Sequence, residues 1–211
     1  MSSTLPIVEK FHSIQGEGNH TGCSAFFIRL ASCKVGCSWC DTKHSWSSDH
    51  FKEENVINLS KEVVSARSLG AAFVVITGGE PLHHNLNQLC QAIRESTNTQ
   101  GKLAIPIHLE TSGVDPISGN PNWITLSPKR HAPPRDELIQ ACQELKVVIN
   151  EKEDLIFAEK MANKTQSKNK PLLFIQPGWN NEKGQKLAYQ YVLSHSEWRL
   201  SMQTHKWLGV L

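Results

Sequence analysis

Three cysteines, Cys33, Cys37 and Cys40, lie in the run Cys-Lys-Val-Gly-Cys-Ser-Trp-Cys, which has the spacing C-x3-C-x2-C. This short loop supplies three thiolates and no fourth. A structural zinc site needs four ligands in a closed shell, and an ordinary four-iron ferredoxin cluster also needs four cysteines. Three cysteines therefore indicate a 4Fe–4S cluster in which one iron stays open and can bind a molecule that reacts.

Two other interpretations stay open: a zinc knuckle completed by a nearby histidine such as His44, and three unrelated cysteines. The triplet together with Trp39, just before the last cysteine, favours the cluster. In this loop the sequence resembles the radical S-adenosylmethionine (SAM) enzymes. In that superfamily the open iron chelates the amino and carboxylate groups of SAM. Electron transfer then cleaves a C–S bond and releases a 5′-deoxyadenosyl radical.

A glycine-rich segment, Ile76–Pro81 (Ile-Thr-Gly-Gly-Glu-Pro), ends an apolar run and begins a loop. Its two glycines allow positive φ and close approach of a ligand to the backbone. Alone this signal is weak, because a turn with an acidic residue commonly ends a strand. Radical SAM enzymes have a similar motif that binds the amino group of SAM. The resemblance therefore implies that Gly79 and Glu80 contact SAM, with Glu80 as an acceptor for the ammonium.

A second glycine-rich segment, Ser13–Gly18 (Ser-Ile-Gln-Gly-Glu-Gly), lies near the N-terminus. Its flexible backbone bears one anion and one amide, which suits a heterocycle with both hydrogen-bond donors and acceptors. The alternative is a plain glycine turn after an amphipathic strand. The composition of the segment favours a ligand loop over a hairpin.

Together these motifs resemble the 7-carboxy-7-deazaguanine synthase family, which acts in the biosynthesis of queuosine and other 7-deazapurines. The resemblance rests on Gln-Gly-Glu-Gly, on Phe-Ile-Arg-Leu, and on the cysteine run followed by Asp-Thr-Lys. It extends nearly end to end, through Thr-Gly-Gly-Glu-Pro and four later segments: Ser127–Lys129, Leu145–Val148, Ile175–Pro177 and Gln203–Lys206.

The resemblance implies a radical-mediated ring contraction. In it, 6-carboxy-5,6,7,8-tetrahydropterin becomes 7-carboxy-7-deazaguanine with loss of ammonia. The adenosyl radical abstracts the hydrogen at C6, and SAM is regenerated rather than consumed. The family also uses Mg2+, bound beside the cluster through the threonine after Cys-Asp, which here is Thr42. A hydroxyl oxygen suits this hard cation.

Arg29 is the expected partner of the substrate carboxylate, because a guanidinium can bind a carboxylate with a bidentate fork. An unpaired arginine in a buried strand would also be costly. Glu17 is expected, from its chemistry, to accept hydrogen bonds from the guanidine-like edge of a pterin. No residue is assigned as a general acid or base. The resemblance implies further SAM contacts at Ser127, Pro128, Lys129, Gln176, Pro177, Gly178 and Trp179, and substrate contacts at Ile14, Gln15, Gly16, Thr77 and the main chain of Leu211.

The whole chain has an ordinary globular composition. It has 211 residues with 39% hydrophobic and 20% charged side chains, which predicts one domain spanning residues 1–211. A net charge of +2 gives no electrostatic case for nucleic acid. We find no signal peptide and no apolar run long enough for a membrane span. Six cysteines without a secretory signal predict a reducing, cytoplasmic location.

Short apolar runs alternate with helical segments, so we expect an α/β fold. The number of β–α units is too small for an eight-fold barrel. A partial, open (β/α) barrel of the radical SAM type with about six parallel strands fits, with its site at the carboxyl ends of the strands. The expected strands are Ala25–Leu30, Phe73–Thr77, Ile105–Glu110, Trp123–Leu126, Leu145–Ile149 and Leu172–Ile175. The expected helices are Ser60–Leu69, Leu86–Glu95, one opening at Pro134–Asp136, Glu151–Met161 and Asn181–Ser194; Asn163–Lys170 is expected to be a polar loop.

The resemblance also implies a homodimer and an electron donor such as flavodoxin or ferredoxin. Two alternatives remain open. One is a radical SAM activase that installs a glycyl radical on a partner protein, which would share the cysteine triplet and the glycine–glutamate motif. The Gln-Gly-Glu-Gly loop and the Cys-Asp-Thr sequence argue against it. The other is a non-enzymatic zinc-binding interaction module.

Overall fold

A computed structural model describes residues 3–47, 51–99, 101, 103–165 and 170–211. Within these residues, nine strands form one sheet in the order β3-β1-β2-β4-β5-β6-β7-β8-β9. Each pair of neighbours from β2–β4 to β8–β9 is parallel, whereas β1 is antiparallel to both β2 and β3. The strands are β1 (Thr4–Ile14), β2 (Ser24–Leu30), β3 (Lys52–Asn55), β4 (Phe73–Gly78), β5 (Ile107–Thr111), β6 (Trp123–Leu126), β7 (Glu144–Ile149), β8 (Leu172–Pro177) and β9 (Trp198–Leu200).

The first parallel strands carry buried apolar residues on both faces, as β4 illustrates. Val74 and Ile76 pack in the large core beneath the helices, whereas Phe73 and Val75 pack in a smaller cluster on the opposite face. Strands buried on both faces have near-continuous apolar sequences. This double burial explains why these strands are recognisable from sequence.

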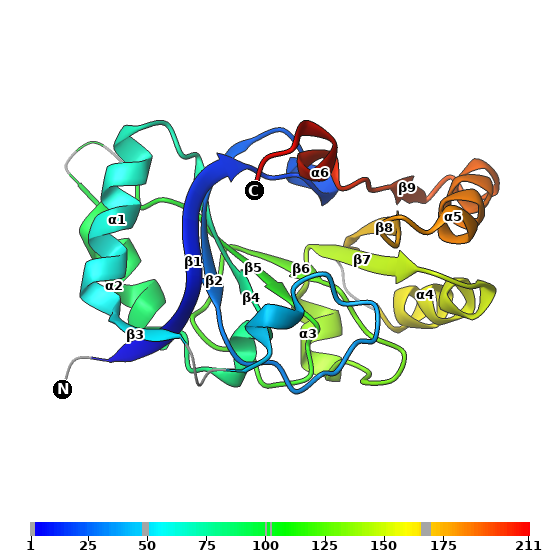
Figure 1. Cartoon of the computed structure of the whole chain (residues 1–211), viewed down its shortest axis with the longest axis horizontal. Helices are drawn as coiled ribbons and strands as arrows, with labels where there is room; N and C mark the ends of the chain where they lie inside the picture. The colour runs from blue at the N-terminus through cyan, green and yellow to red at the C-terminus, as the bar shows by residue number, and fades with distance from the viewer. Residues whose placement is uncertain (1–2, 48–50, 100, 102, 166–169) are drawn as a thin grey trace.

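The helices cover the outside of the curved sheet. In Figure 1, β1 arches across one side of the molecule with α1 and α2 beyond it, and α6 lies near the C-terminus above the strands. No helix among the described residues is long and apolar enough to cross a membrane. The helices are α1 (Val56–Ser68), α2 (Asn87–Thr97), α3 (Asp136–Ala141), α4 (Lys152–Lys164), α5 (Glu182–Ser194) and α6 (Thr204–Leu208).

The six expected strands are all present, and the open parallel sheet is confirmed. Among the described residues the parallel set has one further short strand, because β9 continues it beyond β8. The expected N-cap at Ser60 was wrong: α1 begins four residues earlier, where the Asn55 side chain accepts a hydrogen bond from Ile57 N at 2.8 Å. Ser60 lies inside the helix. The expected loop after α4 includes residues 166–169, which lie outside the described residues.

Candidate active site

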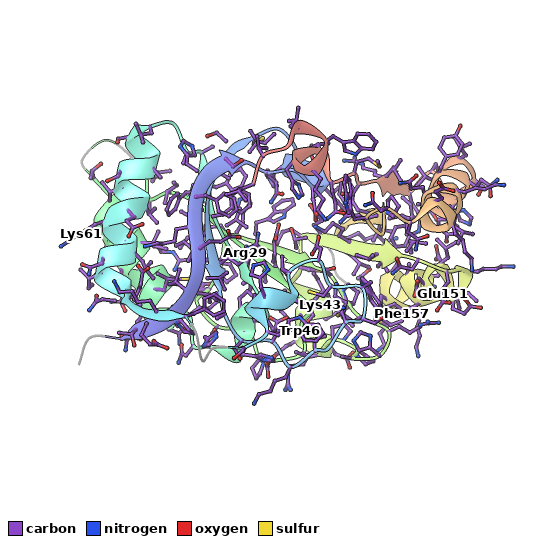
Figure 2. All side chains as sticks on the ribbon, in the orientation of Figure 1. Arg29, Lys43, Trp46, Lys61, Glu151 and Phe157 are labelled. Carbon is purple, nitrogen blue, oxygen red and sulfur yellow. The ribbon has the colours of Figure 1, made fainter. Side chains whose placement is uncertain are left out.

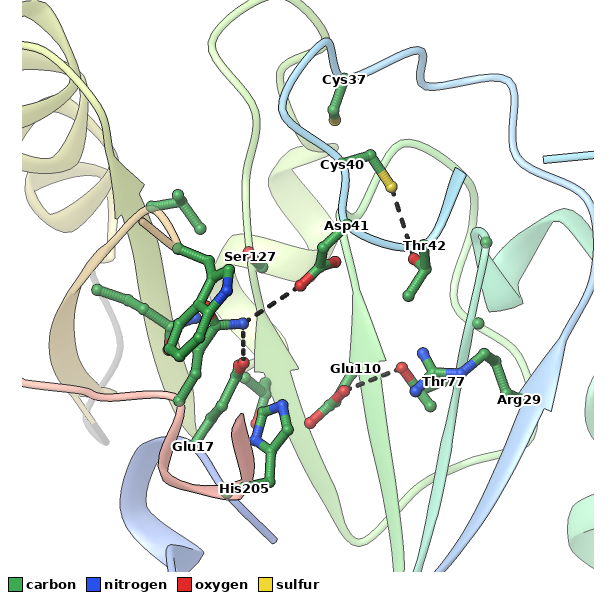
Figure 3. A pocket seen from close by; sticks show the side chains of 18 of the residues that line it. Glu17, Arg29, Cys37, Cys40, Asp41, Thr42, Thr77, Glu110, Ser127 and His205 are labelled. Carbon is green, nitrogen blue, oxygen red and sulfur yellow. Dashed lines mark hydrogen bonds between the residues drawn. The ribbon is translucent and has the colours of Figure 1, made fainter. Parts of the chain in front are cut away.

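A cavity of about 530 Å³ opens at the carboxyl ends of the parallel strands, where α/β folds place their sites. Its walls come from the ends of β2 and β4 to β8, the cysteine loop, the Gln15–Gly18 loop and the C-terminal segment. Figure 3 shows Cys37 and Cys40 on one side of this space, with Glu17 and His205 on another. Segments distant in sequence therefore face a common space.

All three cysteines of the loop line this cavity, and all three are free thiols. The loop is fastened at its base, where Cys33 N donates to Trp46 O at 3.0 Å, and is turned by a bond from Cys40 N to Cys37 O at 3.1 Å. Burial raises the pKa of the Cys33 and Cys37 thiols. Both therefore keep their protons without metal, and a bound cluster must displace them.

Three cysteine thiols are the type of ligand that a 4Fe–4S cluster takes. Among the described residues, no three His, Cys, Asp or Glu side chains close around one ion position. A 4Fe–4S cluster is larger than one ion and binds its cysteines at different corners. The Lys129 ammonium lies beside this space, donates to Ser127 Oγ at 2.8 Å, and forms no ion pair with any described residue. Desolvation lowers the pKa of Lys129, which an anionic ligand would offset.

The Gly78–Gly79 pair lets the strand end and the cysteine loop meet. Gly78 has φ of +144°, a region that favours glycine. A Cβ added to Gly79 would lie 2.3 Å from Ser32 O and 2.9 Å from the Cβ of Cys33. Any larger residue at position 79 would therefore displace the first cysteine.

Glu80 is a buried carboxylate whose oxygens are already used within the protein. It accepts hydrogen bonds from Leu82 N at 3.1 Å, from Thr111 Oγ1 at 2.5 Å, and from both the backbone and the hydroxyl of Ser112. These bonds fix the end of β4 to the end of β5. A contact between Glu80 and a SAM ammonium would add a further bond to oxygens that already accept four.

Arg29 lines the cavity but is not unpaired. Its Nε donates to Glu9 Oε1 at 2.6 Å, and its side chain is 19% exposed. Figure 2 shows Arg29 inside the concave side of the sheet, whereas Lys61 lies at the periphery. Arg29 is therefore not the unpaired buried arginine that the sequence suggested, because β1 supplies the glutamate. The position of Arg29 in the cavity still suits a carboxylate ligand.

Glu110, at the end of β5, joins two of the expected substrate residues. Gln15 Nε2 donates to Glu110 Oε1 at 3.0 Å, and Thr77 Oγ1 donates to Glu110 Oε2 at 2.9 Å. Figure 3 shows this carboxylate directed into the cavity. Glu110 was not among the residues expected at the site. Its place as the last residue of an expected strand, at the edge where Thr77 also lies, was the available signal.

Glu17 forms an ion pair with Lys146, a buried lysine of β7, and its other oxygen accepts from Gln203 Nε2 at 2.9 Å. Burial alone would raise the pKa of Glu17, but Lys146 and these hydrogen bonds lower it to about 2. The carboxylate is therefore ionised at neutral pH. Neither Lys146 nor Gln203 was among the residues expected at the site.

The C-terminal segment closes one side of the cavity. Thr204 N donates to Gly16 O at 2.9 Å, and Ser13 Oγ donates to Leu211 O at 2.7 Å. His205 lies so close over Gly16 that a Cβ there would be 2.0 Å from the His205 Nδ1 atom. The segment thus holds the Gln15–Gly18 loop from above.

Three kinds of comparison agree on what this chain resembles. Residues 14–112 match the family model described as a 4Fe-4S single cluster domain. The chain is 60% identical to the 7-carboxy-7-deazaguanine synthase of Prochlorococcus marinus, over 100% of both chains. The chain belongs to the 7-carboxy-7-deazaguanine synthase family. The synthase of Synechocystis sp. is 45% identical over 100% of this chain and 95% of its own, and that of Escherichia coli is 33% identical over 97% and 98%.

The fold of this family is also known from a solved structure. The crystal structure of QueE from Escherichia coli matches with a TM-score of 0.81 at 30% identity, over 95% of this chain and 94% of that one. This likeness confirms the fold expected for a 7-carboxy-7-deazaguanine synthase.

Nearly all residues expected at the synthase site face the cavity. The exception is Pro128, which is buried and does not line it. Gln176, at the end of β8, accepts from Ser201 Oγ at 2.7 Å, and Trp179 is 40% exposed. The expected residues that line the cavity are Ile14, Gln15, Gly16, Glu17, Arg29, Cys33, Cys37, Cys40, Thr42, Thr77, Gly79, Glu80, Ser127, Lys129, Gln176, Pro177, Gly178, Trp179 and Leu211.

Proposed function

We propose that this chain is a radical SAM enzyme that converts 6-carboxy-5,6,7,8-tetrahydropterin into 7-carboxy-7-deazaguanine with loss of ammonia, in the biosynthesis of queuosine and other 7-deazapurines. The main support within the structure is a single cavity lined by three free cysteines, a guanidinium and an ionised carboxylate. The cysteines suit a cluster with an open iron. Arg29 and Glu17 suit the two ends of a carboxylated pterin.

Cys33, Cys37 and Cys40 would hold the 4Fe–4S cluster, and Thr42 would bind Mg2+. The cluster and SAM, when bound, supply the adenosyl radical. Thr42 Oγ1 lies 3.5 Å from Cys40 Sγ, so its hydroxyl is beside the proposed cluster position. The side chain of Lys129 would offset the negative charge of this region. SAM would contact Gly79, Glu80, Ser127, Pro128, Lys129, Gln176, Pro177, Gly178 and Trp179.

The substrate would lie between Arg29 and the Gln15–Gly18 loop. Arg29 would bind its carboxylate with a bidentate fork. Glu17 would accept from the amino-pyrimidinone edge at the other end. The residues of the protein would act mainly by orienting the pterin and excluding water. Ile14, Gln15, Gly16, Thr77 and the main chain of Leu211 would complete the contacts.

An electron donor such as flavodoxin or ferredoxin would reduce the cluster, and the enzyme would act as a homodimer. A cytoplasmic location fits the six cysteines, which are all free thiols. A reducing compartment keeps such thiols available for a cluster.

Anaerobic turnover tests this proposal. The reconstituted protein is incubated with SAM, Mg2+, a reductant and 6-carboxytetrahydropterin, and products are identified by mass. We expect 7-carboxy-7-deazaguanine. Cleavage of SAM to 5′-deoxyadenosine without this product would contradict the proposed pterin substrate and favour the activase alternative. An iron-loaded, folded protein that does neither would contradict the radical SAM assignment itself.

A further inference from the structure

Lys146 of β7 is a charged residue at a buried position. It lies in β7 between Leu145 and Val147, which are both buried, and its own side chain is only 5% exposed. A lysine is rarely buried without an anionic partner, because desolvating the ammonium is costly. The partner here is Glu17, from a loop 129 residues earlier in the chain. Buried ion pairs contribute little to the free energy of unfolding, so we expect this pair to have a role other than stabilising the fold.

The other acids near Lys146 have partners of their own. Glu144 on the same strand accepts from Asn19 N at 3.0 Å, and burial raises its pKa. Glu110 accepts from Gln15 and Thr77. Among these carboxylates, only Glu17 forms an ion pair with Lys146.

Glu17 has few other cations to keep it ionised. The groups facing it from neighbouring elements are Gln203, His205 and Lys206 of the C-terminal segment, Asp41 of the cysteine loop, Gln176 of β8, Lys129 after β6, and Glu110 and Glu144 of the sheet. Lys206 is paired with Asp41, and Lys129 lies towards Cys37. Burial lowers the pKa of His205, so this histidine is neutral at pH 7. Without Lys146, burial would favour the protonated form of Glu17.

We propose that Lys146 is a positioning residue that holds the Glu17 carboxylate ionised and directed into the cavity, so that Glu17 accepts hydrogen bonds from the amino-pyrimidinone edge of the substrate. The proposal rests on the proposed function, since it names how that substrate is recognised. An ionised carboxylate has about four lone-pair sites. Lys146 and Gln203 occupy two of them, and the Gln176 side chain also hydrogen-bonds to this carboxylate. About one site is then left to accept from an N–H group at that edge of a pterin. A protonated Glu17 would instead present a donor to that donor.

The test is the pH dependence of kcat/KM for 6-carboxytetrahydropterin, measured anaerobically with the reconstituted enzyme between pH 6 and 9. The variants are Lys146→Gln, Lys146→Met and Lys146→Arg. The control is Lys10→Gln, which removes a half-buried lysine paired with Glu54 and Glu62 on the outer face of β1, away from the cavity. Iron content and SAM cleavage without pterin report the folded, loaded state of each variant.

We expect Lys146→Gln and Lys146→Met to lose kcat/KM at pH 7 and to regain it as pH rises, by about tenfold per pH unit below the new pKa of Glu17. The loss should lie in KM for the pterin, with KM for SAM unchanged. Lys146→Arg and Lys10→Gln should keep the wild-type profile. Adding Glu17→Gln to Lys146→Gln should abolish the new pH dependence.

A wild-type profile in Lys146→Gln or Lys146→Met would overturn the inference. A uniform loss at every pH would also contradict it, because a purely structural role predicts that result. If the uncharged variants do not fold, Glu17→Gln in the wild-type background decides: it should raise KM for the pterin without altering SAM cleavage, and an unchanged KM would overturn the inference. Failure of the wild-type enzyme to make 7-carboxy-7-deazaguanine would instead refute the proposed function.

Discussion

Lys206 of α6 forms an ion pair with Asp41, the residue that follows the last cysteine of the cysteine loop. Lys206 Nζ also lies 5.0 Å from the ring centre of Trp179, next to the end of β8. The C-terminal segment therefore contacts the expected cluster, SAM and substrate regions at once. Val210 and Leu211 complete the wall of the cavity beyond it.

Removal of Val210 and Leu211 should weaken substrate binding selectively. The main-chain oxygen of Leu211 is held by Ser13, beside the expected pterin position. Loss of one hydrogen bond to a charged group corresponds to about 1.5–3 kcal/mol, or roughly a ten- to hundredfold increase in KM for the pterin. Leu211→Ala keeps the main chain and is the matched control. Steady-state kinetics with equal KM values for both variants would contradict a main-chain role.

Replacing Cys33, Cys37 or Cys40 with alanine should abolish iron binding and SAM cleavage. Each of these thiols lines the cavity, whereas the other described cysteines do not, so none of them can take the place of a missing ligand. The loss of SAM cleavage should exceed about a hundredfold, the upper range for residues that only support metal ligands. Cys23→Ala, at an exposed cysteine outside the cavity, is the control. Full iron content in any one of the three variants would show that its cysteine is not a ligand.

Gly79→Ala should damage the cluster more than the fold. The new Cβ would lie 2.3 Å from Ser32 O, at the base of the cysteine loop. The control is Gly184→Ala, whose Cβ would lie at the same 2.3 Å from Ile149 O, far from the cysteines in sequence and in α5. Both variants should lose about 1–3 kcal/mol of stability through overpacking. Only Gly79→Ala should also lose iron, as measured by metal analysis of the purified proteins.

Arg29→Lys should reduce kcat/KM for the pterin while leaving SAM cleavage intact. Lysine keeps the positive charge but loses the planar fork that matches a carboxylate. The expected loss is about ten- to hundredfold, equivalent to one charge-assisted hydrogen bond. Glu9→Gln leaves the guanidinium in place and removes only the negative charge of its partner at 2.6 Å, because the amide oxygen can still accept from Arg29 Nε. Its effect should therefore be smaller. A larger effect of Glu9→Gln would mean that kcat/KM depends on the Arg29–Glu9 ion pair rather than on a bidentate contact between the guanidinium and the substrate carboxylate.

Acid should destabilise the metal-free protein through His108. This histidine stacks on Phe73 with 4.0 Å between ring centres, and burial together with His20 lowers its pKa to about 3. The unfolded chain takes up this proton below about pH 6.5, whereas the folded protein does not. The contribution of His108 to the free energy of unfolding is therefore complete above about pH 6.5 and is lost as the pH falls towards 3. The loss is at most about 1.4 kcal/mol per pH unit for this one proton.

Urea unfolding at pH 7, 6 and 5 checks this expectation, and His108→Phe is the control because it keeps a ring against Phe73 and removes the proton. The free energy of unfolding should change less with pH in His108→Phe, by the contribution of one proton. Equal slopes in the two proteins would show that another group causes the acid sensitivity.

The parts of the fold with strong local signals were predictable. Most of the six expected strands have near-continuous apolar sequences. By contrast β9 is three residues long, and β3 (Lys-Glu-Glu-Asn) has no apolar residue. Their pairing depends on neighbours in the sheet rather than on their own sequence, so it was not visible in advance.

The same contrast applies to the site. The three cysteines are predictable because their spacing places three thiols in one loop. Lys146 and Gln203 are distant in sequence from Glu17, and only the closure of the sheet and the C-terminal segment brings them together. A lysine inside an apolar strand was nevertheless a visible signal that an acid had to lie opposite.

The most direct test of the central claim is EPR spectroscopy of the anaerobically reconstituted and reduced protein, with and without SAM. If three cysteines hold a 4Fe–4S cluster with an open iron, the signal of the reduced cluster should change on addition of SAM and should be lost in Cys37→Ala. A fully iron-loaded protein whose signal SAM leaves unchanged would contradict the account.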